Sequence, residues 1–194
     1  MLISVTSLKG GAGKTTTAMH LAIVAAKAGS DVVLIDADPE QSALSWASLA
    51  ELPIKVVPAE RDSLARQSRS LLEARSLVVI DTPPNDRELL VRSSMIADVV
   101  VVPVKPTGLD VHRLRPTLEL LREVEATRGV LDVAILFTHW DGRRILSREA
   151  AEALAAFPLL ASRIRNLTRY EQAFGAEPAY LEEYEQVWEE LQNG

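Results

Sequence analysis

The stretch MLISVTSLKGGAGKTTT (residues 1–17) joins an apolar strand, Leu2 to Val5, to a glycine-rich loop and the start of a helix. The glycines of this loop, Gly10, Gly11 and Gly13, let successive backbone N–H groups converge on an anion, because no Cβ atom obstructs its approach. The N-terminus of the following helix adds its positive partial charge at the same place. The stretch therefore predicts a phosphate-binding loop.

Two lysines and a threonine give this loop its expected chemistry. Lys14 is placed to contact the β- and γ-phosphates of a nucleotide, and the Thr15 hydroxyl to reach Mg²⁺. The loop departs from the pattern G-x-x-x-x-G-K-[ST], because Leu8 stands where the first glycine belongs and a second lysine, Lys9, follows it. The strand, loop and helix context favours a nucleotide site over a surface turn.

Acidic residues stand at the ends of two other apolar runs. The first run, 32–35, is followed by Asp36 and Asp38, and the second, 77–80, by Asp81. Continuous apolar runs are typical of strands in a parallel sheet, whose carboxyl ends bind ligands. We expect Asp36 and Asp81 to hold Mg²⁺, mostly through water, and Asp38 to orient or deprotonate the attacking water. The alternative is that Asp38 caps the next helix.

The rest of the chain alternates between strands and helices, which predicts one domain over residues 1–194. The expected fold is α/β, a doubly wound, mostly parallel sheet of about seven strands flanked by helices. Ser147 is expected to cap one of the helices. Beyond the elements above, strands are expected at 54–57, 98–104, 130–137 and 159–164, and helices at 14–28, 40–50, 61–74, 110–128, 147–157 and from about 179 to the end.

Composition excludes several kinds of site. The sequence contains no cysteine, so it forms no disulfide, thiolate metal site or cysteine-ligated iron–sulfur cluster, as in a reducing cytoplasm. No apolar run approaches the length of a membrane span, and the first residues do not resemble a signal peptide. His139 has no second histidine or cysteine nearby, so a metal role is not expected for it.

Charge is distributed unevenly along the chain. The net charge is −6, but residues 171–194 hold seven glutamates and no lysine or arginine. The other 170 residues hold 21 basic and 20 acidic residues. The segment 163–170 carries Arg163, Arg165 and Arg169 and no acid. Bulk charge is therefore a poor guide to local binding surfaces in this chain.

The motifs K-G-G-A-G-K-T-T (9–16), D-A-D-P (36–39) and V-V-I-D-T-P-P (78–84) resemble those of the ParA/MinD group of deviant Walker ATPases. The segments 103–110 and 136–143 also resemble ParA, so the resemblance covers nearly the whole chain. It is strongest to the short ParA partition ATPases, which lack an N-terminal DNA-binding extension. The first strand begins at residue 2, which leaves no room for such a domain in this sequence.

The resemblance implies a role for each motif position. Lys9 matches the signature lysine that reaches the partner subunit's nucleotide, and Thr16 would contact the α-phosphate. Asp38 matches the residue that activates water, and Thr138 would lie near the adenine. The remaining matches are the loop residues Gly10, Gly11, Ala12, Gly13, Lys14 and Thr15, the supporting acid Asp36, the Walker B acid Asp81, and the DNA-binding segment with Arg163, Arg165 and Arg169.

The resemblance further implies a cytoplasmic, nucleoid-associated ATPase that takes ATP and Mg²⁺. ATP would close a homodimer that binds DNA non-specifically, and a ParB-like centromere-binding protein would stimulate hydrolysis. The arginines could instead be scattered surface charges or pair with the acidic tail.

Two other functions stay open. One is a positioning ATPase of the MinD type, which would end in a basic amphipathic helix, whereas the tail here is acidic. The other is a metabolic P-loop enzyme such as an amide-forming synthase. The presence of Lys9 disfavours this second alternative.

Overall fold

Strand β1 (Leu2–Val5) lies at the centre of a seven-stranded sheet with the strand order β3-β2-β4-β1-β5-β6-β7. The computed structural model describes residues 1–193, without the side chains of Arg61 and Glu171. Every neighbouring pair of strands is parallel, which confirms the predicted doubly wound fold. The other strands are β2 (Val32–Asp36), β3 (Lys55–Pro58), β4 (Leu77–Asp81), β5 (Val99–Val104), β6 (Asp132–Trp140) and β7 (Leu159–Arg165).

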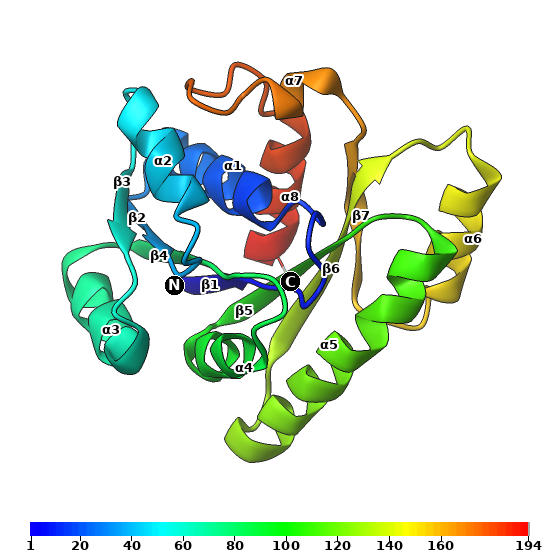
Figure 1. Cartoon of the computed structure of the whole chain (residues 1–194), viewed down its shortest axis with the longest axis horizontal. Coiled ribbons are helices and arrows are strands. Elements are labelled where there is room, and N and C mark those ends of the chain that lie inside the picture. The colour runs from blue at the N-terminus through cyan, green and yellow to red at the C-terminus, as the bar shows by residue number, and fades with distance from the viewer. Residues whose placement is uncertain (194) are drawn as a thin grey trace.

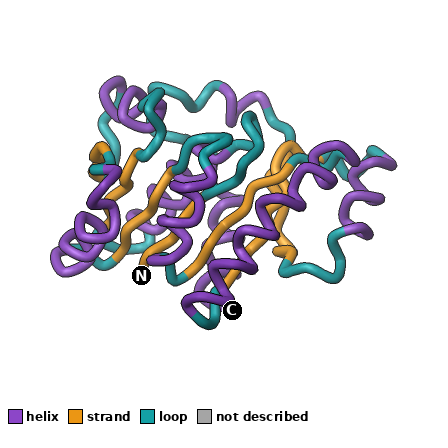
Figure 2. Tube along the Cα trace, turned by 60° about the horizontal axis from the view of Figure 1, so that its bottom comes forward, coloured by secondary structure: helices purple, strands orange, loops and turns teal. Residues whose placement is uncertain are grey.

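Helices cover both faces of this sheet (Figure 1). Seen in Figure 2, the strands run side by side between them. One face carries α1 (Lys14–Lys27), α2 (Ser42–Leu49), the short α7 (Thr168–Glu171) and α8 (Glu182–Asn193). The other carries α3 (Leu64–Ala74), preceded by the 3-10 turn η1 (Arg61–Ser63), and α4 (Arg87–Ile96), α5 (Gly108–Arg128) and α6 (Ile145–Ala153).

The apolar runs of the inner strands separate into two cores because successive side chains point to opposite faces. Ile3 and Val5 of β1 join the core under α1 and α8, whereas Leu2 joins the core under α3 to α6. Strands β2 and β4 are buried at every position, as the continuous apolar runs predict.

Strand register places the predicted acids at one level of the sheet. Asp36 pairs with Asp81 across β2 and β4, and Asp81 pairs with Val5 across β4 and β1. The phosphate loop begins directly after Val5. The carboxyl ends of three adjacent strands therefore bring both acids to the loop.

Helix α4 is absent from the sequence-based prediction. Asp86 begins it, and the Asp86 side chain accepts a hydrogen bond from the Leu89 backbone N–H at 2.9 Å. Its buried face carries Ser93 and Ser94 beside leucines, and the Ser93 hydroxyl bonds to the Ser4 hydroxyl at 2.9 Å. These buried serines weaken the apolar periodicity that would have indicated a helix.

The prediction that Ser147 caps a helix over 147–157 is wrong. Helix α6 begins two residues earlier, with Arg144 in the capping position, and it ends at Ala153. Ser147 is buried inside the helix, and its hydroxyl has no hydrogen-bond partner among the described residues. The start of α6 lacks a sequence signal, because its exposed first residues, Ile145 and Leu146, do not resemble a polar cap. The final helix α8 likewise begins at Glu182 rather than near Ala179.

Candidate functional site

The loop between β1 and α1 has the conformation that its glycines allow. Gly11 and Gly13 adopt φ angles of +69° and +86°, which side chains with a Cβ rarely tolerate. The Thr17 backbone N–H donates to the Gly13 carbonyl at 2.9 Å, which closes the first turn of α1. A Cβ on Gly13 would lie 3.6 Å from the Thr138 side chain, so β6 packs closely on the loop.

The two loop lysines lie in different surroundings. Lys14 is buried, and its ammonium donates to the Lys9 carbonyl at 3.2 Å. Burial lowers the pKa of Lys14, while Asp81 and Asp38 act in the opposite direction. Lys9 has a side chain that is 37% exposed, and its ammonium lies 3.9 Å from an Asp110 carboxylate oxygen. Lys14 therefore belongs to the interior of the loop, and Lys9 to its rim.

Asp81 is the most unusual acid of the site. It is fully buried, and neither carboxylate oxygen has a hydrogen-bond partner among the described residues. Burial raises the pKa of Asp81 to about 7, against the effect of the Thr15 hydroxyl, which faces it. The charged form of a buried carboxylate needs polar or charged partners, and Mg²⁺, which prefers oxygen ligands, would be one. Thr15 and Asp81 therefore fit a Mg²⁺ ion bound with nucleotide phosphates.

Asp36 and Asp38 both bond to nearby backbone. The Asp36 carboxylate accepts from the backbone N–H groups of Asp38 at 3.1 Å and Leu44 at 2.9 Å, so it anchors the start of α2. Burial raises its pKa. Asp38 is more exposed, and one of its oxygens accepts from the Glu40 N–H at 3.0 Å. The capping role considered for Asp38 thus falls to Asp36, which accepts from the first turn of α2, whereas Asp38 accepts from the loop before it.

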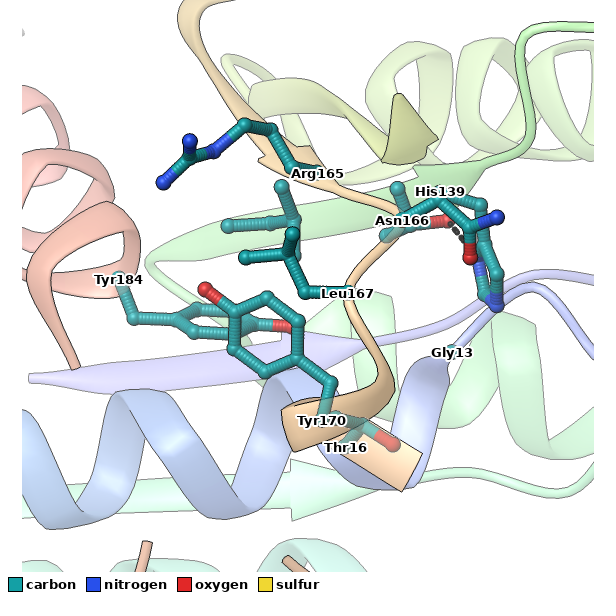
Figure 3. Close-up of a pocket in the computed structure, with 10 residues that line it drawn as sticks. Gly13, Thr16, His139, Arg165, Asn166, Leu167, Tyr170 and Tyr184 are labelled. Carbon is teal, nitrogen blue, oxygen red and sulfur yellow. Dashed lines mark hydrogen bonds between the residues drawn. The ribbon is translucent and has the colours of Figure 1, made fainter. Parts of the chain in front are cut away.

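A cavity of about 70 Å³ opens beside the loop (Figure 3). Gly13 and Thr16 line its loop side, and Thr138 lines the β6 side. The Thr138 hydroxyl donates to the Ala12 carbonyl at 2.8 Å, which ties β6 to the loop. The cavity holds about two water molecules, so a nucleotide base would require its rim to open. Its other lining residues are His139, Ile164, Arg165, Asn166, Leu167, Tyr170 and Tyr184.

Sequence reasoning missed most of this cavity. Asn166 and Leu167 follow β7, whereas Tyr170 and Tyr184 come from α7 and α8. No local motif joins these residues, and they meet only because α8 packs between α1 and β7. The Tyr184 hydroxyl bonds to the Thr17 hydroxyl at 3.2 Å, which fixes this contact.

His20 lies under the cavity in an aromatic cluster. Its ring stacks on Tyr184, with ring centres 4.7 Å apart, and its Nδ1 lies 2.7 Å from the Thr16 carbonyl oxygen. The ring is fully buried, and Nε2 has no hydrogen-bond partner among the described residues. Burial lowers the pKa of His20 to about 4.

This low pKa makes folding sensitive to acid. The unfolded chain takes up a proton at this histidine below pH 6.5, whereas the folded chain does so only near pH 4. The stability contributed by neutral His20 is therefore present above pH 6.5 and lost as the pH falls to 4, by about 3 kcal/mol. We expect the free energy of unfolding of His20→Gln to fall less with decreasing pH than that of the wild-type protein, as measured by urea unfolding at pH 7.5, 5.5 and 4.5. Equal pH dependence in both proteins would contradict the assignment.

Two of the three arginines expected to bind DNA pack on aromatic rings. The Arg163 guanidinium carbon lies 5.4 Å from the ring centre of Phe137 and 5.5 Å from that of Trp140. Arg169 lies 4.1 Å from the ring centre of Tyr180. Burial lowers the pKa of Arg163. These side chains are partly engaged within the fold.

The third arginine is paired with the acidic helix. Arg165 donates from its backbone N–H to Glu183 at 2.8 Å, from its guanidinium to Glu183, and to the Tyr180 hydroxyl at 2.6 Å. Glu183 also accepts from the Tyr170 hydroxyl at 2.8 Å. Glu190 of the same helix accepts from two backbone N–H groups of β7, at 2.7 and 2.9 Å. The acidic tail therefore folds directly beside the arginine segment.

No cluster of three or more His, Cys, Asp or Glu side chains that could hold a metal is found among residues 1–193. Within the same range, no helix has the length and apolar character that a membrane span needs.

The arrangement of loop, sheet and acids defines a P-loop nucleotide-binding protein, and comparison with known proteins gives its family. The model of the CobQ/CobB/MinD/ParA nucleotide-binding domain matches residues 3–176. The chain belongs to this family, the ParA/MinD ATPases.

Its curated relatives include partition and positioning proteins. Protein ParA of Rhizobium radiobacter is 30% identical over 141 residues, which are 71% of this chain and 64% of that protein. The chromosome partitioning protein ParA of Caulobacter vibrioides is 30% identical over 80% of this chain and 75% of its own length. The maintenance of carboxysome distribution protein A of Halothiobacillus neapolitanus is 24% identical over 88% of this chain and 82% of its own.

A solved structure shares the fold. The plasmid partition protein BB_S35 of Borrelia burgdorferi, bound to AMPPNP, superposes with a TM-score of 0.81 at 19% identity, over 99% of this chain and 98% of its own.

Proposed function

We propose that the protein is an ATP-dependent dimerisation switch with weak ATPase activity. This proposal rests on the different surroundings of the two loop lysines. Lys14 lies within the loop, whereas Lys9 stands on the rim with a partly exposed side chain near Asp110. A rim lysine can extend to a phosphate held by a second copy of the chain. ATP would then be shared between two subunits.

Hydrolysis in such a site depends on positioning and charge. Lys14 and the loop N–H groups would bind the β- and γ-phosphates, with Thr16 at the α-phosphate and Thr138 near the base. Thr15 and Asp81, with Asp36 as a supporting acid, would hold Mg²⁺, which neutralises phosphate charge. Asp38 is the more exposed acid, which suits it to orient or deprotonate the attacking water.

We propose DNA partition as the biological role, in the nucleoid of the cytoplasm, with a ParB-like partner that stimulates hydrolysis. The ParA relatives support partition, and the carboxysome relative supports the positioning of a protein cluster as the alternative cargo. The acidic helix α8 does not favour a MinD-type membrane role, because its apolar face packs on the core through Tyr184 and Val187. Liposome sedimentation with ATP tests this second role.

DNA binding is expected to require a nucleoside triphosphate. In a mobility-shift assay, a non-hydrolysable ATP analogue should shift non-specific duplex DNA, whereas ADP should not. Because phosphate contacts release counterions, the affinity should fall steeply with salt. A combined Arg163→Gln and Arg169→Gln variant should weaken the shift, and Arg115→Gln, on the exposed face of α5, serves as its control. Binding that is independent of nucleotide would contradict the DNA switch.

A further inference from the structure

Lys105 lies over the phosphate loop, although no motif of the loop includes it. It directly follows β5, whose neighbour in the sheet is β1, the strand that leads into the loop. A Cβ built on Gly11 would have the Lys105 ammonium nitrogen as its nearest heavy atom, at 4.0 Å. The adjacency of β1 and β5 thus brings a third lysine to the loop from a distant part of the sequence.

The lysines of this chain are concentrated at this place. The sequence has only five lysines, and three of them, Lys9, Lys14 and Lys105, lie at the loop. Of the other two, Lys27 pairs with Glu177 at 2.7 Å, and Lys55 is exposed at the start of β3. Lysine, a compact point charge, suits binding to a single phosphate group.

The surroundings of Lys105 leave its charge available to a bound anion. Its side chain is half-buried, and it forms no ion pair with the side chains that the structure describes. Lys9, by contrast, has Asp110 nearby. The Lys105 ammonium therefore stands at the loop with no carboxylate within ion-pair distance among the described side chains, and a phosphate bound there would supply the negative charge.

The proposed position of the base indicates which phosphate this would be. In the proposed function the base lies near Thr138, which lines the cavity together with Gly13 and Thr16 at the helix end of the loop. A polyphosphate that starts there would run back along the loop toward Lys9 and Gly11. Gly11 therefore lies away from the base, toward the terminal phosphate.

We propose that Lys105 is a third phosphate-binding lysine that contacts the terminal phosphate and selects ATP over ADP. This inference rests on the proposed function, because it assumes that the loop binds ATP. Lys14 contributes affinity for both nucleotides, whereas Lys105 contributes affinity only when the third phosphate is present.

Calorimetric titration with ADP and with a non-hydrolysable ATP analogue, both with Mg²⁺, tests this role. We expect Lys105→Gln to raise the Kd for the analogue about tenfold and to change the Kd for ADP by less than about twofold, because only the analogue carries the third phosphate. Lys105→Arg should keep most of the affinity for the analogue because it keeps the charge. Lys55→Gln, which removes an exposed lysine far from the loop, is the matched control. The melting temperatures of the nucleotide-free variants verify folding, and Lys105→Met replaces the glutamine variant if that one unfolds.

Unchanged binding of the analogue, or equal weakening of analogue and ADP, would overturn the role of Lys105 and leave the proposed function intact. Failure of the wild-type protein to bind either nucleotide would overturn the proposed function together with this inference. Lys14→Gln separates the role of Lys105 from the proposed function, since it should weaken the binding of both nucleotides if the loop is the site.

Discussion

Replacing Lys9 with alanine is expected to abolish ATP-dependent dimerisation and to reduce stimulated ATP hydrolysis by about 10³-fold or more. A cation supplied in trans to the transferring phosphoryl group contributes on the order of 10³–10⁵ to the rate in phosphoryl transfer. Nucleotide binding should survive in Lys9→Ala, because Lys14 and the glycine loop are unchanged. Hydrolysis is measured as phosphate release, and binding by titration with ADP.

The matched control for Lys9 is Lys55→Ala, which removes an exposed lysine at the edge of the sheet. If Lys9→Ala hydrolyses ATP and dimerises as the wild-type protein does, the rim lysine has no role in trans. If it instead loses ADP binding as well, Lys9 acts within its own loop.

Replacing Glu183 with alanine is expected to give the largest loss of stability among the glutamates of α8, about 3 kcal/mol. Glu183 is buried and accepts hydrogen bonds from the Arg165 backbone, the Arg165 guanidinium and the Tyr170 hydroxyl. Its removal leaves a part-buried backbone N–H and a buried hydroxyl without acceptors, and hydrogen bonds to charged groups contribute about 1.5–3 kcal/mol each. The measurement is urea unfolding monitored by circular dichroism.

Glu185→Ala is the control for this prediction. It removes an exposed glutamate from the same first turn of α8, so the two variants change the helix dipole alike. A difference of less than about 1 kcal/mol between them would show that the Glu183 network contributes little. Arg165 and Tyr170 also line the cavity beside the loop, so Glu183→Ala should additionally weaken nucleotide binding if the base lies there, as we propose.

The phosphate loop and the strand-end acids were predictable from sequence because their signals are local. Gly13, Lys14 and Thr15 follow a strand directly, and Asp36 and Asp81 each close an apolar run. Strand order and register then place the acids together, as the parallel fold requires.

The remaining parts depend on contacts that sequence patterns do not encode. Helix α4 is hidden by buried serines, Ser93 and Ser94. Tyr184 reaches the cavity only through the packing of α8, and Lys105 reaches the loop only through the adjacency of β1 and β5. The sequence around Arg165 indicates no partner for its charge, but α8 folds back and supplies one, Glu183.

The claim that ATP is shared between two subunits is tested most directly by the mass of the protein in solution. Size-exclusion chromatography with light scattering would compare the wild-type protein without nucleotide, with ADP, and with a non-hydrolysable ATP analogue and Mg²⁺. We expect a monomer in the first two conditions and a dimer in the third, with Lys9→Ala monomeric in all three. A wild-type protein that stays monomeric with the analogue, or that is dimeric regardless of nucleotide, would contradict the account.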